Sequence, residues 1–160
     1  MSERIEDVIA RAESNLEEIV AGGGDALQFG FDIGTLGRAV VAHPPHQPDI
    51  AAFAHRTAPL IARSVSELKD SVAWVHRVSY ATESLSSDTE LYVRALMMRS
   101  DLEFLREIYC DTVASSKIAE IDTAEMDANL QEWGRNQYLD SVPANIPSTH
   151  VWWHQSLSGI

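Results

Sequence analysis

The stretch SDTELYVRALMM (residues 87–98) opens the segment of this chain that is apolar on almost every side. Ser87 and Glu90 have the spacing of a capping box, in which a hydroxyl and a carboxylate bond to free N–H groups at the start of a helix. The residues that follow, up to position 98, contain only one charge, Arg94. A helix that is apolar all round is buried all round. We therefore predict a central helix that runs from this box to about Val113.

The N-terminal third of the chain predicts two more helices. Residues 3–20 place apolar side chains at three- and four-residue steps with acids between them, and the three glycines at 22–24 end that helix. Residues 26–42 follow, with Asp25 as their cap. Over 26–34 the apolar residues fit a strand as well as a helix, and we favour a helix because no second strand is present to pair with it.

Three glycines, Gly30, Gly34 and Gly37, fall on the segment 26–42. Each costs a helix about 1 kcal/mol relative to alanine. They give the helix a smooth surface on which another helix or a ligand can come close, and tight packing there would offset the cost. We therefore predict a contact surface at these three positions.

Prolines punctuate the next segment. Three of them make residues 43–48 a stiff, non-helical loop. A short helix over 49–56 and a long one from Thr57 to about Tyr80 are predicted after it. Thr57 as the cap leaves Pro59 in a first turn, where proline is tolerated.

The C-terminal part begins with a second capping pattern. Asp122-Thr123-Ala124-Glu125 opens a helix that is predicted to run to about Leu139. Residues 141–160 are predicted to be an extended tail because prolines interrupt them. A short last helix, which Ser148 or Thr149 caps, ends that tail.

These patterns define the fold class. The apolar period is 3.6 residues nearly throughout, and no internal repeat or domain boundary is present. We predict an all-α protein, a single-domain irregular bundle of five to seven helices over residues 1–160. The lone Cys110 lies in an apolar run and is predicted to be a buried small hydrophobe.

Composition excludes several classes of function. The chain carries 24 acidic and 12 basic residues, a net charge of −12, which argues against nucleic acid as a partner. It suits a protein that binds other proteins. No apolar stretch is long enough to span a membrane, and the acidic N-terminus does not resemble a signal peptide, so we expect a cytoplasmic location.

Histidines offer a metal site. On an α-helix, His150 and His154 share one face at i and i+4, and His43 or His46 could add a third imidazole from the proline-rich loop. Three imidazoles and an open position would make a catalytic site for Zn, Fe or Ni. The same residues also suit ordinary positions in a tail and a loop, and both interpretations stay open.

Part of this pattern resembles the DinB/YfiT-like family of helical metal-binding proteins. The similar features are the chain length, the early His46 and the late His-x-x-x-His pair. The resemblance implies a four-helix bundle with a three-histidine metal site. The sequence departs from the family after His154, where a basic residue, Gly and Gln are expected and Gln155-Ser156-Leu157 stands instead.

A second short spacing involves Arg38 and His43. Arg-x4-His is similar to the spacing in helical, RNA-cleaving HEPN proteins, in which arginine holds a phosphate and histidine exchanges a proton. The acidic charge of the chain disfavours RNA as the partner.

Aromatic residues suggest contact surfaces. Trp152 and Trp153 are adjacent, and two adjacent residues cannot both face inward on one α-helix, so we expect one of them to contact a partner chain, a ligand or another segment. An apolar pocket is a further interpretation, and its lining residues would be Phe29, Phe31, Trp74 and Trp133.

Together these patterns predict a small acidic binding or assembly protein. It would be a self-associating module or a subunit, with a protein partner or a second copy at the tail and the glycine surface. The alternatives are a histidine-ligated metal enzyme or metal-binding protein, and a pocket protein for an apolar small molecule. The sequence contains no phosphate-binding loop, serine nucleophile elbow or zinc-finger pattern, so whether it is an enzyme stays open.

Overall fold

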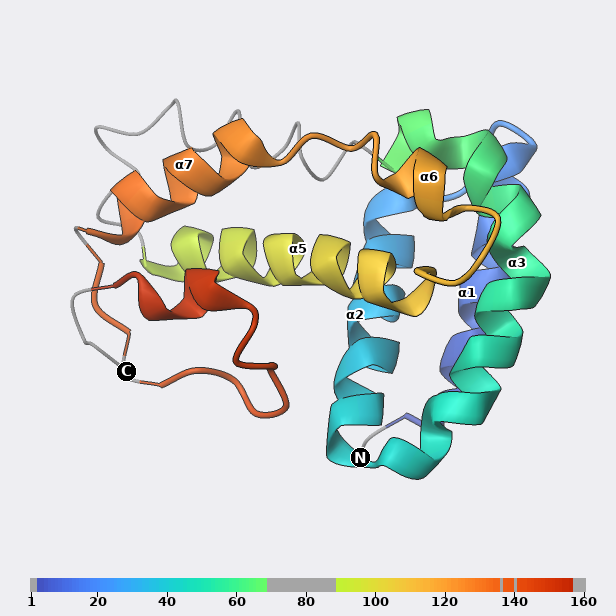
Figure 1. Ribbon diagram of the computed structural model, residues 1–160, viewed down its shortest axis with the longest axis horizontal. Coiled ribbons are helices and arrows are strands. Elements are labelled where there is room, and N and C mark those ends of the chain that lie inside the picture. Colours follow the sequence, from blue (N-terminus) through green and yellow to red (C-terminus); the bar gives the residue numbers. More distant parts are fainter. Residues whose placement is uncertain (1–2, 69–88, 136, 140, 157–160) are drawn as a thin grey trace.

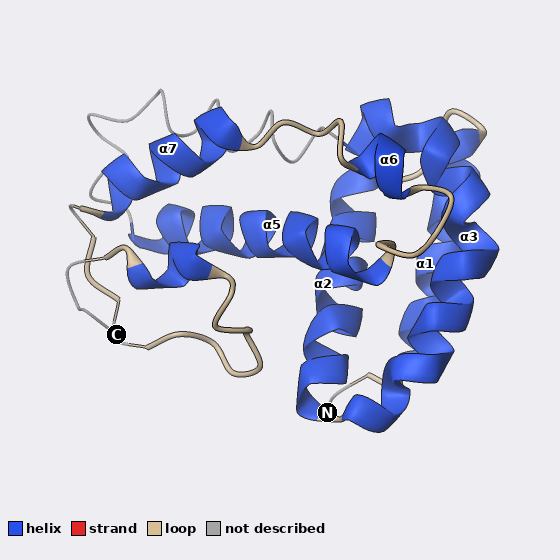
Figure 2. Ribbon diagram, viewed as in Figure 1, coloured by secondary structure: helices blue, strands red, loops and turns tan. Residues whose placement is uncertain are grey.

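The computed structural model describes residues 3–68, 89–135, 137–139 and 141–156 (Figure 1). This part of the chain contains six α-helices, two 3-10 helices and no strand, which confirms the all-α prediction (Figure 2). The elements in chain order are α1 (Ile5–Val20), α2 (Ala26–Ala42), the 3-10 helix η1 (Pro44–His46), α3 (Gln47–Leu68), α5 (Thr89–Ile108), α6 (Ser115–Ile118), α7 (Ala124–Gly134) and the 3-10 helix η2 (Val151–His154). None of these helices has the length and apolar character needed to cross a bilayer.

Helix α5 is the element around which the others pack. It crosses α2 and contacts α3, α6, α7 and η2 (Figure 1). Its C-terminal half, with Phe104 and Leu105, joins a first apolar cluster with α1, α2, α3 and α6. Its N-terminal half, with Tyr92 and Leu96, joins a second cluster with α7 and the tail. The predicted central helix is therefore confirmed, although Ser87 and Asp88 of its capping box lie outside the described residues.

Helix α2 forms as its cap predicts. The Asp25 carboxylate accepts hydrogen bonds from the backbone N–H groups of Leu27 and Gln28, both at 3.1 Å. The choice of helix over strand for 26–34 is confirmed. An ion pair ties α2 to α1, because Arg11 donates from Nη2 to Oδ1 of the fully buried Asp32 at 2.6 Å.

A second helix does come close at the glycines of α2. A methyl group on Gly34 would collide with the Asp101 carboxylate of α5, and one on Gly37 would collide with the Phe104 ring. At Gly30 a methyl group would meet nothing within 4 Å. The predicted close approach is therefore confirmed at two of the three positions, and the helix that uses it belongs to the same chain.

The prediction of two helices that meet at residues 56–57 is wrong in the place of the break. Helix α3 runs across Pro59, and its kink lies further along at Ser64, where φ is −120° and ψ is 16°. Pro59 and His55 are both exposed, so water can reach the His55 carbonyl that loses its N–H partner. The Thr57 hydroxyl donates to the Phe53 carbonyl at 2.7 Å and does not cap a new helix. Residues 69–80 lie outside the described residues.

Helix α3 also begins earlier than expected. The proline-rich loop folds into η1, and α3 starts directly after it at Gln47, with Pro48 in the first turn. Proline fits there because the first N–H groups of a helix have no intrahelical partner. The prediction of a non-helical loop over 43–48 is therefore wrong for most of that segment.

The C-terminal end of α5 also differs from prediction. Helix α5 ends at Ile108 because the Thr112 hydroxyl donates to the Tyr109 carbonyl at 2.8 Å and closes a turn. Tyr109 takes the buried position there, and Cys110 is exposed, so its predicted burial is wrong.

Helix α7 is shorter than its capping pattern predicts. It ends at Gly134, well before Leu139. Its Thr123 makes no capping bond, and the Asp122 carboxylate accepts from the backbone N–H of Ala124 at 2.9 Å instead. The tail is non-helical over residues 141–150, as expected, and His150 precedes η2 where Ser148 or Thr149 was predicted as the cap.

The close approach of α2 and α5 makes a prediction about stability. We expect Gly37→Ala to lower the free energy of unfolding by about 1–3 kcal/mol, because the added methyl group overpacks a buried ring. Gly30→Ala is the matched control on the same helix, and we expect it to raise the free energy of unfolding by up to about 1 kcal/mol through helix propensity. Urea unfolding followed by circular dichroism measures both. Equal stability of the two variants would contradict the contact.

Candidate functional site

Three consecutive polar residues, Arg99, Ser100 and Asp101, interrupt the apolar surface of α5, and all three are buried. Successive residues of an α-helix point about 100° apart, so each of the three faces a different neighbour. Arg99 faces α7 and η2, Ser100 faces the tail, and Asp101 faces α2.

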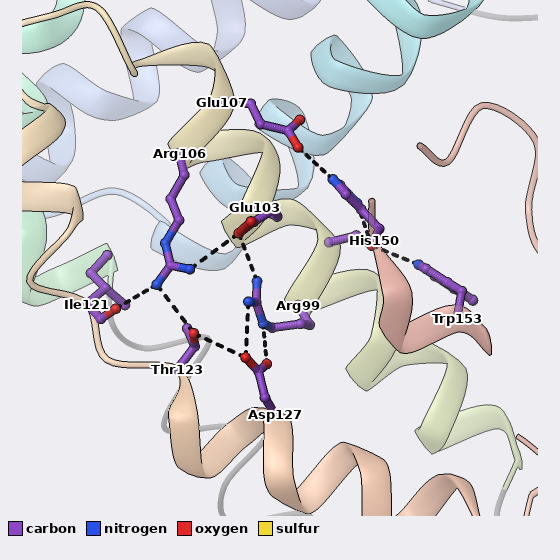
Figure 3. Close-up of polar contacts among 10 residues, drawn as sticks. Arg99, Glu103, Arg106, Glu107, Ile121, Thr123, Asp127, His150 and Trp153 are labelled. Carbon is purple, nitrogen blue, oxygen red and sulfur yellow. Dashed lines mark hydrogen bonds and ion pairs between the residues drawn. The ribbon is translucent and has the colours of Figure 1, made fainter. Parts of the chain in front are cut away.

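Arg99 joins α5 to α7 by a two-pronged ion pair. Its guanidinium donates to the two carboxylate oxygens of Asp127, at 2.5 and 3.2 Å, and to Glu103 at 3.3 Å. The ring of Trp152 lies against the same guanidinium, with 3.8 Å from its carbon to the ring centroid. Figure 3 shows that the network continues through Glu103 to Arg106, which donates to the Ile121 carbonyl.

Ser100 holds the tail. Its hydroxyl accepts a hydrogen bond from the indole N–H of Trp153 at 2.7 Å and lies 3.2 Å from Nδ1 of His150. Nε2 of His150 lies 2.9 Å from the Glu107 carboxylate (Figure 3). A carboxylate only accepts, so Nε2 carries a proton, and on the neutral ring Nδ1 accepts from the Ser100 hydroxyl. Both ring nitrogens of His150 thus have protein partners.

The tail histidines and tryptophans are not arranged as an α-helix would place them. The segment Val151–His154 is a 3-10 helix with three residues per turn, so positions four apart do not share a face. His150 is fully buried and His154 is exposed. Trp152 and Trp153 are 5% and 1% exposed. Because this segment is not an α-helix, both tryptophans can be buried, and both contact another segment of the chain: Trp152 packs on Arg99 and Trp153 bonds to Ser100.

His43 and His46 lie elsewhere and contact each other, with 4.7 Å between their ring centroids. Both line a cavity that Arg38 also lines. Across residues 3–68, 89–135, 137–139 and 141–156, no three His, Cys, Asp or Glu side chains are grouped to hold a metal ion. A metal at these histidines stays a prediction, and the metal content of the purified protein tests it.

Asp101 is a buried carboxyl with an imperfect partner. Its Oδ1 lies 3.6 Å from Nη1 of Arg38, and neither atom makes a hydrogen bond in the described part of the chain. Burial raises the pKa of Asp101 to about 8, against the smaller opposing effect of Arg38. Burial thus disfavours the charged form of Asp101, and Arg38 has a weak counter-charge.

An apolar groove of about 410 Å³ lies between α2 and the N-terminal half of α5. Its apolar walls are formed by Leu27, Phe31, Val93, Met97 and Met98, with Asp101 also in the lining. Leu27 and Phe31 are 43% and 50% exposed. The charged side chains of the lining near the start of α5, Glu90 and Arg94, are exposed.

This groove differs from the apolar pocket that the sequence suggests. Phe29 is buried in the first cluster and Trp133 in the second, so they do not share a cavity. Phe31 lines the groove, and Trp74 lies outside the described residues. The sequence contains a sign that Phe29 and Phe31 do not line one pocket. Leu27, Phe29 and Phe31 alternate, and residues two apart on a helix point to different sides.

Comparison with known proteins gives no match to a family model, a curated protein or a solved structure. The function of this chain is therefore argued from its own residues.

The bonds to Ser100 yield a second prediction. Alanine has the higher helix propensity, so propensity alone predicts that Ser100→Ala stabilises α5. We expect the opposite, a loss of about 1–3 kcal/mol, because the change leaves the Trp153 N–H and His150 Nδ1 buried without a partner. Ser66→Ala, at an exposed position of α3, is the control. Urea unfolding measures the stability of both variants and of the native chain. A Ser100→Ala variant as stable as the native chain would contradict the network.

The raised pKa of Asp101 predicts a pH dependence of stability. Between its ordinary value of 3.8 and about 8, the folded chain binds more protons at Asp101 than the unfolded chain does. The free energy of unfolding due to this group therefore falls as the pH rises through that window. We expect Asp101→Asn to remove this fall, so that its stability relative to the native chain increases from pH 5 to pH 8. Asp111→Asn, at an exposed position, should keep the native slope, and parallel slopes for all three proteins would contradict the assignment.

Proposed function

We propose that this protein works by binding, and that the α2–α5 groove takes the same face of a second copy of the chain. The observation that carries the proposal is the exposure of Leu27 and Phe31, at 43% and 50%. They stand on a helix that buries Phe29, Ile33 and Leu36. Large apolar side chains grouped at a groove are typical of interaction surfaces.

The shape of the groove suits a symmetric pair. Leu27 and Phe31 are one turn apart on α2, and Val93 and Met97 are one turn apart on α5, so each wall presents a row at i and i+4. A two-fold rotation can place the exposed row of each copy in the hollow of the other, because the same patch serves both partners in such a contact. Met97 is an adaptable side chain at surfaces of this kind.

Charge supports the same pairing. Glu90 and Arg94 have opposite charges and are both exposed on α5 at i and i+4. In a two-fold pair, Glu90 of each copy would face Arg94 of the other. Such a contact fixes the register of the pair more than it adds affinity. Each chain has a net charge of −12, so two copies repel at long range and the apolar contact must overcome that repulsion.

A second candidate function rests on the size of the groove. About 410 Å³ is within the range of small-molecule sites, roughly 300–1,000 Å³. An apolar small molecule would use the same walls. It would leave the chain monomeric, so the mass of the protein in solution separates the two functions.

Sedimentation equilibrium tests self-association. We expect the average mass to rise with concentration above the 17.7 kDa of one chain. Phe31→Asp and Met97→Asp each place a charge in the groove and should weaken association at least about tenfold, or about 1.4 kcal/mol. Val113→Asp is the matched control, because Val113 is 74% exposed and does not line the groove.

Salt adds a second readout to this experiment. Added salt screens the repulsion between two acidic copies, so self-association through apolar contacts should strengthen as the ionic strength rises. Binding of a basic partner would instead weaken as the ionic strength rises. A native chain that stays monomeric at all concentrations and salts would overturn self-association, as would a Val113→Asp variant that dissociates as readily as Phe31→Asp.

A further inference from the structure

A second cavity, of about 440 Å³, lies where the end of α2 and η1 meet the start of α1. Its polar side chains include Thr35, Arg38, His43 and His46. Ile5, Val8, Leu36, Ala39 and Ala42 form its apolar walls. The groove described above shares no residue with it.

The cationic group in this cavity is Arg38. Its Nη2 donates to the Thr35 hydroxyl at 3.4 Å, a long bond, and its buried Nη1 makes no hydrogen bond in the described part of the chain. The Asp101 carboxyl is 3.6 Å from it, without a hydrogen bond between the two atoms, and burial raises the pKa of Asp101 to about 8, which disfavours its charged form. Because Nη1 is buried beside Asp101, which does not line this cavity, the guanidinium can offer an incoming oxyanion its other N–H groups.

The two imidazoles add to this character. His43 and His46 contact each other edge to face, and both line the cavity. An imidazole offers at least one N–H donor, so each ring can bond to an anion. The acid at the cavity wall, Glu3, accepts from Arg11 at 2.5 Å, so its charge already has a partner.

We propose that this cavity binds a small organic anion, whose phosphate or carboxylate head lies against Arg38, His43 and His46 and whose apolar body lies on Ile5, Val8 and Leu36. The volume admits a ligand of metabolite size. The lining combines polar and apolar side chains, which favours an anion that carries an apolar group over a bare ion. The inference does not depend on the groove or on self-association.

Isothermal titration calorimetry with three probes tests the site. Phenyl phosphate and benzoate carry the two head groups on one apolar body, and inorganic phosphate carries the head alone. We expect at least one of the two aromatic anions to bind at least about tenfold more tightly than inorganic phosphate. The better of the two identifies the head group.

Variants assign the binding to this cavity. Arg38→Gln, and separately His43→Ala combined with His46→Ala, should each weaken the better probe at least about tenfold. The histidine pair lies in exposed or half-buried positions, so the doubly substituted chain keeps the test valid if Arg38→Gln disturbs the fold. His55→Ala and Arg63→Gln, at exposed positions of α3 outside the cavity, should leave the affinity unchanged.

Three results would overturn the site. The first is no heat from either aromatic anion at millimolar concentration. The second is equal affinity for inorganic phosphate and the aromatic anions, which would remove the apolar walls from the site. The third is native affinity in a folded His43→Ala and His46→Ala variant together with native affinity in Arg38→Gln.

Discussion

The run of Arg99, Ser100 and Asp101 in the middle of a buried helix is the constraint on which the rest of this fold depends. Apolar contacts fix the position of a helix through the fit of its side chains and have no direction of their own. A buried polar group is costly unless a partner meets it at one distance and angle. Since these three residues point in three directions, α5 has one rotation that brings Arg99 to Asp127, Ser100 to the tail and Asp101 to Arg38 together.

The same constraint explains why the other elements are shaped as they are. The glycines of α2 leave room for Asp101 and Phe104, so α2 can come close enough for Arg38 to face the carboxyl. The tail holds its two tryptophans in a short 3-10 helix, where Trp152 lies on Arg99, Trp153 bonds to Ser100 and both join the second apolar cluster. Helix α5 thereby connects two apolar clusters that otherwise have different helices.

The sequence predicts those features that local chemistry decides. The period of 3.6 residues identifies the helices, Asp25 identifies a cap, and glycine spacing identifies the place of closest approach. It does not predict features that depend on distant residues. Whether Pro59 breaks a helix depends on whether water reaches the carbonyl of His55, four residues earlier. Whether Cys110 is buried depends on the turn that Thr112 closes.

The candidate sites divide in the same way. His43, His46 and Arg38 are close in sequence and share a cavity. His150 is far from them along the chain and has partners that only the folded tail provides, at Ser100 and Glu107. The groove joins α2 to α5, and nothing in either segment alone shows that Phe31 would stay exposed beside Met97.

The two clusters that share α5 also become complete in a fixed order as the chain is synthesised. A chain leaves the ribosome from its N-terminus, and nearly all of the first cluster lies between Ile5 and Ile121. The second cluster waits for Trp152 and Trp153, which are made much later. Until then the N-terminal half of α5 has α2 and α7 beside it but lacks the two tryptophans that complete its cluster.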